Sequence, residues 1–363
     1  MSQRCPGKRR ASVASRLRDI TFHALLVVAL AGCSVAELEK LATEKDRQKP
    51  TRTPSGTGLS QKVGDELLSP ESVITGGRQS LTGYVGQFSR MAIGEGDEIK
   101  FMEPVAVGGI EGLLYIVDAD PKIIYRYDLV LNEISAIPDI GTYLQGPPGK
   151  IYVAQDRSFY IVDSNGKQVL HFNELGELIT RFQDLANLSR PIDVVVNEET
   201  GEVMVADGSF SHIVIFNSVG KAIKAIGQRG TGPGRFRAMT AMTLGEDGLF
   251  ILDRLELPVQ VLTLDGEYRY SFGENDLVFP TSIAIDQDQR VFVGDRSDNK
   301  IRVYQNGQLL LTYGGGGSDP GRFRIITGLW VSGNLLYVAD SLNGRVQVLR
   351  INPTAPVEVT PTS

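Results

Sequence analysis

The dominant feature of the sequence is a pattern of apolar and polar positions that occurs six times. Each copy begins with an aspartate that ends an apolar run, and Ile or Val follows six positions later. The six aspartates are Asp118, Asp163, Asp207, Asp253, Asp295 and Asp340, and successive copies lie 45, 44, 46, 42 and 45 residues apart. Such regular spacing indicates a repeat architecture in which every copy forms the same supersecondary unit.

Each copy contains four short apolar stretches separated by turn residues. The first often begins with Pro, as in 191–196 and 280–285, and the second ends at the aspartate. In the third, apolar residues occupy alternate positions, as at Val346 and Val348. The fourth follows a turn that contains glycine, as in 308–313. Four strands in about 40–45 residues is one propeller blade. The pattern therefore predicts an all-β, six-bladed β-propeller with four antiparallel strands per blade, over residues 84–351.

The last copy has no fourth strand, because a Pro/Thr-rich tail, 352–363, begins directly after its third. An apolar segment at 86–93 precedes the first blade and belongs to no blade of its own. We expect this N-terminal strand to complete the sixth blade and close the ring. Closure would remove an exposed strand edge, which otherwise invites aggregation.

The N-terminus carries export signals. Six basic residues and one acid precede an apolar run at 20–31, which is shorter than the roughly 20 residues that span a bilayer. The run ends in Leu30-Ala31-Gly32-Cys33, which resembles the lipobox of bacterial lipoprotein precursors. That resemblance implies a signal peptide at 1–32, cleavage before Cys33 and acylation of Cys33. An ordinary signal peptide followed by a chance cysteine is the alternative.

The lipobox implies a protein tied by its lipid to a membrane of the bacterial cell envelope. Ser34 follows the cysteine in place of the Asp that often retains lipoproteins at the inner membrane, which favours the outer membrane. A polar, Pro/Gly-rich stretch then reads as a tether, so Cys33 and the tether are assigned to 33–83.

Charge and cysteine content narrow the class of protein. Removing 1–32 leaves 31 Lys and Arg against 42 Asp and Glu, a net charge of about −11. An acidic exported chain is poorly suited to nucleic acid, whose binding depends on phosphate neutralisation. The two cysteines are Cys5, in the signal peptide, and Cys33, so the mature chain has no disulfide. A domain of this size can bury enough apolar surface without one.

The repeats resemble the NHL family over roughly residues 84–350. The resemblance is carried by GTGPGRF at 230–236, PGRF at 320–323, LYVAD at 336–340 and NGRVQV at 343–348. The second copy departs most, because Gln155-Asp156 forms a tight bend and no Gly-rich loop precedes it. The family implies a propeller that usually binds a partner, and it specifies no ligand.

The six aspartates invite interpretation as a carboxylate ring, but an Asp that closes a strand commonly accepts backbone N–H groups near the turn. We therefore interpret them as structural. Gluconolactonase-like propellers are similar in blade number and in Asp340-Ser341, and they hold a metal in the channel. Here Asp193 is the one carboxylate on a predicted inner strand, and His171 and His212 lie on third strands. The sequence thus predicts no catalytic residue, no metal and no cofactor.

One face of the predicted propeller is rich in arginine. The loops between second and third strands, and those between blades, emerge on the same side because the strands alternate in direction. These loops carry Arg190, Arg229, Arg235, Arg237, Arg254, Arg296, Arg322 and Arg324. Acids interspersed among them, such as Asp298, Glu256 and Glu274, make local ion pairing one interpretation. The other is a surface for anions, because guanidinium groups bind carboxylates in a bidentate manner.

These features favour a membrane-anchored binding or scaffold propeller that docks a protein or a glycan in the envelope. Two alternatives stay open: a hydrolase or lyase of the lactonase type with a metal in the channel, and a structural subunit of an envelope assembly.

Overall fold

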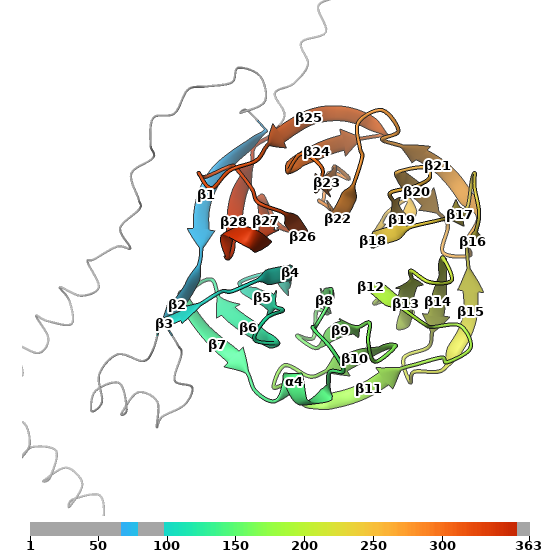
Figure 1. Cartoon of the computed structure of the whole chain (residues 1–363), viewed down its shortest axis with the longest axis horizontal. Coiled ribbons are helices and arrows are strands. Elements are labelled where there is room, and N and C mark those ends of the chain that lie inside the picture. The colour runs from blue at the N-terminus through green and yellow to red at the C-terminus, as the bar shows by residue number, and fades with distance from the viewer. Residues whose placement is uncertain (1–66, 79–97, 354–363) are drawn as a thin grey trace, which may run out of the picture. The chain divides into compact units, whose positions relative to one another are not determined.

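The computed structural model describes residues 67–78 and 98–353. Within them, six four-stranded antiparallel sheets surround a central channel as the blades of a β-propeller (Figure 1). The predicted fold class and blade number are therefore confirmed. The predicted signal peptide, Cys33 and the segment 86–93 lie outside the described residues.

Each blade contributes one strand to each of four concentric layers. The innermost strands are β4 (Pro104–Ile110), β8 (Ile151–Val153), β12 (Pro191–Asn197), β18 (Met239–Gly245), β22 (Pro280–Ile285) and β26 (Ile326–Ser332). The second strands are β5 (Leu113–Asp118), β9 (Phe159–Asp163), β13 (Glu202–Asp207), β19 (Gly248–Asp253), β23 (Val291–Asp295) and β27 (Leu335–Asp340). All six second strands end at the repeated aspartate, as the sequence pattern predicts.

The two outer layers complete the blades. The third strands are β6 (Ile123–Asp128), β10 (Gln168–Phe172), β14 (His212–Phe216), β20 (Val259–Leu262), β24 (Lys300–Gln305) and β28 (Arg345–Ile351). The outermost strands are β7 (Glu133–Ile137), β11 (Leu178–Phe182), β15 (Ala222–Ile226), β21 (Tyr268–Phe272), β25 (Gln308–Gly314) and β1 (Leu68–Ile74). Five of the six blades are thus continuous in sequence, and the sixth takes its outermost strand from the N-terminal side of the domain.

The strand that closes the ring is β1, which corrects two predictions. β1 pairs antiparallel with β28, and Leu68 lies opposite Ile351. The closing strand is therefore not 86–93, and the propeller begins near Leu67 rather than at residue 84. Residues 68–74 were assigned to the tether because the run LSPESVI is mostly polar. Its exposed middle and buried ends, Leu68 and Ile74, fit an outermost strand that is covered on one side only.

A bulge near the start of most inner strands explains why several begin with Pro. In β4, β12 and β22 the register shifts just after Pro104, Pro191 and Pro280, each of which lies opposite a repeated aspartate. Proline has no N–H to donate to a ladder and is tolerated at the first residue of a strand. In these three blades the proline therefore marks where the inner strand begins.

The core lies between neighbouring blades. Alternate residues of one strand face opposite sides of its sheet, so Met204 packs toward the fourth blade while Val205 packs toward the second. Smaller elements join the blades: the parallel pair β16 (Gln228–Arg229) and β17 (Arg235–Phe236), the hairpin of β2 (Gly76–Arg78) and β3 (Glu98–Lys100), and the short helices α4 (Ile140–Tyr143) and η1 (Ser341–Asn343). In the described ranges no helix is long and apolar enough to cross a membrane.

Candidate functional site

The repeated aspartates tie two loops of the propeller together. Asp253 is fully buried, and its carboxylate accepts hydrogen bonds from the backbone N–H groups of Arg237 and Ala238 before the blade, and of Leu255 and Glu256 after the strand. The carboxylate of Asp207 likewise accepts four backbone N–H groups, two before the blade and two after the strand. The carboxylate of Asp340 accepts a hydrogen bond from the side chain of Arg345, whose Nε lies 2.7 Å away. These carboxylates are held inside the blades, so they form no open ring around the channel.

The eight predicted arginines lie in loops on one face of the propeller, and every one of them is exposed. Arg254 and Arg296 follow the repeated aspartates of the fourth and fifth blades, and the other six lie in the connections that lead into β12, β18 and β26. The arginines therefore gather over the third to sixth blades, and the equivalent position before β4 carries Glu103.

Several of these side chains are held in place by groups other than carboxylates. Arg190 donates to the carbonyl of Gly208 at 2.8 Å, and Arg322 donates to that of Gly314 at 2.9 Å. Arg254 and Arg296 both lie against the ring of Phe279, with Cζ 4.9 and 5.8 Å from its centroid. A guanidinium over an aromatic face is attracted by the ring quadrupole. This geometry places two cations side by side near the channel mouth.

Local ion pairing does not neutralise this face. In residues 67–78 and 98–353, none of the eight arginines forms a salt bridge. The nearby acids are engaged elsewhere: Asp298 pairs with Arg302, Glu256 accepts the N–H of Gly232, and Glu274 accepts the hydroxyl of Ser271. The guanidinium groups consequently remain available for an external anion.

A second polar site lies inside the channel, where Asp193 is the one carboxylate that the sequence predicts on an inner strand. Lys150, next to β8, sends its side chain across the channel, and Nζ donates to the carbonyls of Thr281 (3.1 Å) and Thr327. Those carbonyls belong to the fifth and sixth blades, on the far side of the ring from the second (Figure 1). Asp193 on β12 accepts N–H groups from Val194 and from Met242 on the next inner strand, each at 2.9 Å.

Burial and mutual attraction shift the pKa values of this pair in opposing ways. Burial raises the pKa of Asp193 to about 6, although the Lys150 charge and the two backbone N–H groups lower it. Burial also lowers the pKa of Lys150, and the Asp193 charge opposes that change. Both shifts reflect the cost of keeping a charge in a poorly hydrated place.

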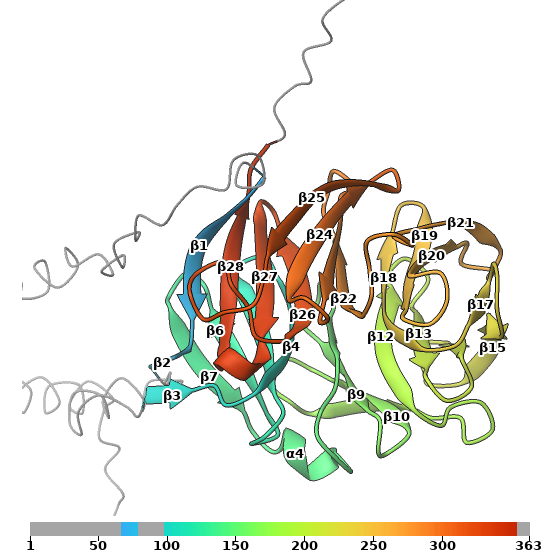
Figure 2. The ribbon, with the colours of Figure 1, turned by 45° about the horizontal axis from the view of Figure 1, so that its top comes forward.

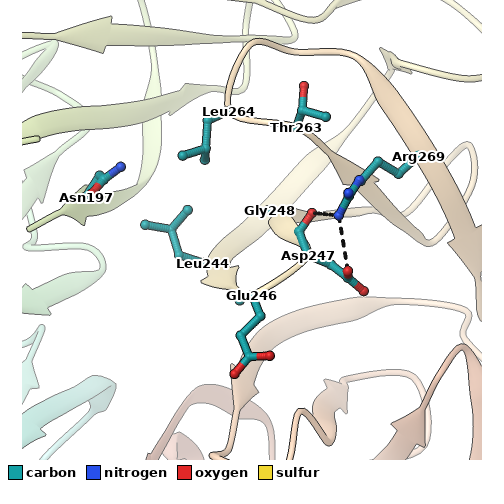
Figure 3. Close-up of a pocket in the computed structure, with 9 residues that line it drawn as sticks. Asn197, Leu244, Glu246, Asp247, Gly248, Thr263, Leu264 and Arg269 are labelled. Atoms are coloured by element: carbon teal, nitrogen blue, oxygen red, sulfur yellow. Dashed lines mark hydrogen bonds and ion pairs between the residues drawn. The ribbon is translucent and has the colours of Figure 1, made fainter. Parts of the chain in front are cut away.

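The channel forms a cavity of about 550 Å³ on the face opposite the arginines. Lys150 and Asp193 line its inner end, while Asn197, Glu198 and Glu199 lie toward its mouth. A shallower pocket of about 340 Å³ shares Asn197 and Leu244 with it and extends to the turns of the fourth blade. Figure 3 shows Arg269 in that pocket donating to Asp247, with Nη1 2.6 Å from its carbonyl oxygen and 3.1 Å from its carboxylate.

Lys150 was missed because the inner strands cannot be aligned by counting from the repeated aspartate. The residues at the equivalent place precede that aspartate by 12 to 14 positions, since the first turn of each blade varies in length. They are Ala106, Lys150, Asp193, Ala241, Ser282 and Gly328. The available signal was a lysine just after Pro147-Pro148-Gly149, at the start of a strand that other blades begin with Pro.

Ser158 and His171 are side chains of the types that serve as nucleophile and base in enzymes, and they lie side by side. Nε2 of His171 lies 2.9 Å from Oγ of Ser158, and the Ser158 hydrogen bonds lower the pKa of nearby Asp156. Ser158 is only 5% exposed, His171 stacks on Tyr160 with ring centroids 3.9 Å apart, and neither pocket described above includes Ser158. This geometry supports packing inside the second blade. In the described part of the chain, no three His, Cys, Asp or Glu residues gather in a metal-binding arrangement.

Comparisons with known proteins support the fold. A family model described as "6-bladed beta-propeller" matches residues 191–304, and a model of the LVIVD repeat matches residues 325–360. No curated protein matches. A solved protein of unknown function from Bacteroides thetaiotaomicron is similar, with a TM-score of 0.57 and 15% identity over 78% of this chain and 76% of the other.

Two solved lyases are also similar. A streptogramin B lyase gives a TM-score of 0.53 at 13% identity over 70% of this chain, and virginiamycin B lyase from Staphylococcus aureus gives 0.51 at 12% over 69%. Each match covers 95% of the lyase. Identity this low shows a shared fold alone. The chain is thus a six-bladed β-propeller, and its function has to be argued from its own residues.

Proposed function

We propose that this protein is a lipid-anchored binding module of the bacterial envelope whose arginine-rich face docks an anionic partner. The observation that carries the proposal is the set of eight exposed arginines without a carboxylate partner in the described residues. Exposed arginines are suited to bidentate recognition of carboxylates. The occupant that we favour is a protein with an acidic surface, and a carboxylated glycan is the alternative.

The point where the chain enters the propeller supports the proposal that the arginine face docks the partner. Leu68 pairs with Ile351 at the end of β28, and β1 runs beside β28 (Figure 2). At the other end of β28 lies η1, where the N–H of Leu342 donates to the carbonyl of Arg324 at 3.1 Å. The N-terminal side of the domain therefore enters on the face opposite the arginines. A lipid on Cys33 would thus be connected to the propeller through the face opposite the arginines.

Preorganisation gives the arginine face a further advantage. Arg254 and Arg296 are already ordered against Phe279, so they lose less side-chain entropy on binding than free arginines would. Phe279 itself is partly exposed between them. An aromatic ring flanked by two cations is a compact anchor of the kind found at the centres of interfaces.

The test uses charge reversal at this anchor. Arg254→Glu with Arg296→Glu should abolish binding of poly-glutamate at low ionic strength and remove partners captured from envelope extracts. Lys221→Glu with Arg157→Glu reverses two charges on the opposite face and should leave both readouts unchanged. Reversal of interfacial charges commonly costs several kcal/mol of affinity, while exposed charges contribute less than about 1 kcal/mol to stability. Equal binding by both double variants would refute docking at the arginine face.

A further inference from the structure

The cavity in the channel is separated from the arginine face by a side chain. Lys150 crosses the channel to the carbonyls of Thr281 and Thr327, and residues beyond this level do not line the cavity. The cavity therefore opens on the opposite face only and ends at Lys150. Its volume of about 550 Å³ falls within the range of small-molecule sites, roughly 300–1,000 Å³.

The inner end of the cavity carries two charged side chains at equivalent positions of neighbouring inner strands. These are the Lys150 ammonium and the Asp193 carboxylate, and Ser282 occupies the equivalent position of β22. The other three strands have Ala106, Ala241 and Gly328 there, which leave room. Lys150 is partly buried and lines the cavity.

Ser282 is the unexplained member of this set. It is 2% exposed, and in the described residues its Oγ has no hydrogen-bond partner. A buried hydroxyl without a partner costs about 1–3 kcal/mol. The serines and threonines nearby are satisfied: Thr281 donates to the carbonyl of Ile326 and Thr240 to that of Pro280. The hydroxyl is enclosed beside Gly294, so the cavity does not expose it to a ligand.

The inner strands add backbone groups to the site. Each inner strand is the terminal strand of its sheet, so one edge of its backbone faces the channel. Met242 shows this directly, since its N–H reaches Asp193 from the neighbouring strand. Donors and acceptors therefore surround the cavity, and apolar side chains such as Ile283 and Leu329 lie between them.

We propose that this cavity binds a neutral, polyhydroxylated molecule of the size of a mono- or disaccharide. Hydroxyl groups both donate and accept, which matches an inner end that combines an ammonium and a carboxylate. Lys150 and Asp193 cancel each other's charge, so the inner end selects neither sign. Glu198 and Glu199 near the mouth disfavour an anion, and an inner end without net charge offers a cation no counter-charge. Trp330 and Tyr152 supply flat apolar surfaces in the lining for the C–H faces of a sugar ring.

Trp330 provides an intrinsic fluorescence probe of the cavity, because it is the single tryptophan of the chain and lines the cavity. The mature protein is titrated with glucose, cellobiose and N-acetylglucosamine while tryptophan fluorescence and calorimetric heat are followed. Gluconate and glucosamine serve as an anionic and a cationic probe of similar size. We expect saturable binding of at least one neutral sugar, and weaker binding of both charged probes.

Two variants locate the binding. Lys150→Met removes the ammonium at the inner end, so the affinity should fall by about tenfold, the effect of losing one good hydrogen bond. Ser282→Ala removes a hydroxyl that the cavity does not expose, so its affinity should stay that of the parent. Ser271→Ala, on the outermost strand β21, is the matched control and should bind like the parent. The proposal is overturned if no neutral sugar binds at millimolar concentration, if a charged probe binds more tightly, or if Lys150→Met binds normally.

Discussion

Lys150 and Asp193 place opposite charges at equivalent positions of neighbouring inner strands, and each charge shifts the pKa of the other toward the ionised form. Each group also joins separate blades, since Lys150 reaches the fifth and sixth and Asp193 reaches β18. The pair therefore links five of the six blades at one level of the channel. Changes at either residue should affect both the stability of the ring and the cavity above it.

The raised pKa of Asp193 predicts a specific pH dependence of stability. The carboxyl has a pKa of about 6 in the folded protein against 3.8 as the ordinary value, so the folded state binds the extra proton between these two values. The contribution of Asp193 to the free energy of unfolding should therefore fall as the pH rises from about 4 to 6, by at most roughly 3 kcal/mol. Asp193→Asn cannot titrate and should lack this component.

The measurement is chemical denaturation of the parent and of Asp193→Asn between pH 4 and 8. The unfolding free energy of the parent minus that of the variant should decrease up to about pH 6 and then level off. Asp265→Asn is the control, because Asp265 is exposed and the Lys224 hydrogen bond and charge lower its pKa. A parent–variant difference for Asp193 that is constant over this range would contradict the raised pKa.

Removal of β1 should open the ring. A mature chain that starts at Gln79 lacks the buried side chains of Leu68 and Ile74 and the backbone pairing to β28. We expect a loss of about 5 kcal/mol or more, since burial of each large aliphatic side chain typically contributes 2–5 kcal/mol by truncation. The exposed edge of β28 should also promote aggregation. Calorimetry and light scattering measure the two effects.

A chain that starts at Gln61 keeps β1 and is the matched control. It should unfold cooperatively at the temperature of the full mature chain. If the chain that starts at Gln79 is equally stable, β1 does not close the ring in solution, and 86–93 becomes the candidate again.

Substitution of a repeated aspartate should destabilise the protein through its backbone partners. Asp207→Ala leaves four N–H groups, those of Ser189, Arg190, Ser209 and Phe210, without their acceptor. Because an unsatisfied donor costs about 1–3 kcal/mol, we expect a loss of about 4 kcal/mol or more in urea denaturation. Glu246→Ala removes an exposed carboxylate and should change stability by less than about 0.5 kcal/mol. Comparable small losses in both variants would show that these bonds contribute little.

Substitution of Cys33 tests the anchor. Cys33→Ala removes the thiol that the lipobox resemblance assigns to the lipid, so the protein should leave the membrane fraction or accumulate with its signal peptide. Subcellular fractionation and the mass of the purified protein measure both outcomes. Ser34→Ala should be processed and anchored as the parent is. Normal fractionation and mass of Cys33→Ala would exclude the lipid anchor.

The blade number and the end of each second strand were available from the sequence because they depend on local information. An apolar run that ends in aspartate, with Ile or Val six positions later, describes one strand, one turn and the start of the next strand. Antiparallel neighbours in sequence are also neighbours in the sheet. Reading Asp118 to Asp340 in this way yields six blades, as the structure has them.

The closing strand and the channel site depended on contacts between residues far apart in the chain. Leu68 meets Ile351 only when the ring is complete, and the polar run between Leu68 and Ile74 has no apolar pattern that distinguishes a strand from a linker. Lys150 likewise resembles a surface lysine until the ring brings Thr281 and Thr327 within reach of its ammonium. The sequence by itself determined the repeating unit, because the hydrogen bonds and turns of a blade are local. Tertiary structure alone decided which strand completes the last blade and which side chains meet across the channel, because a closed ring sets those distances and the chain order does not.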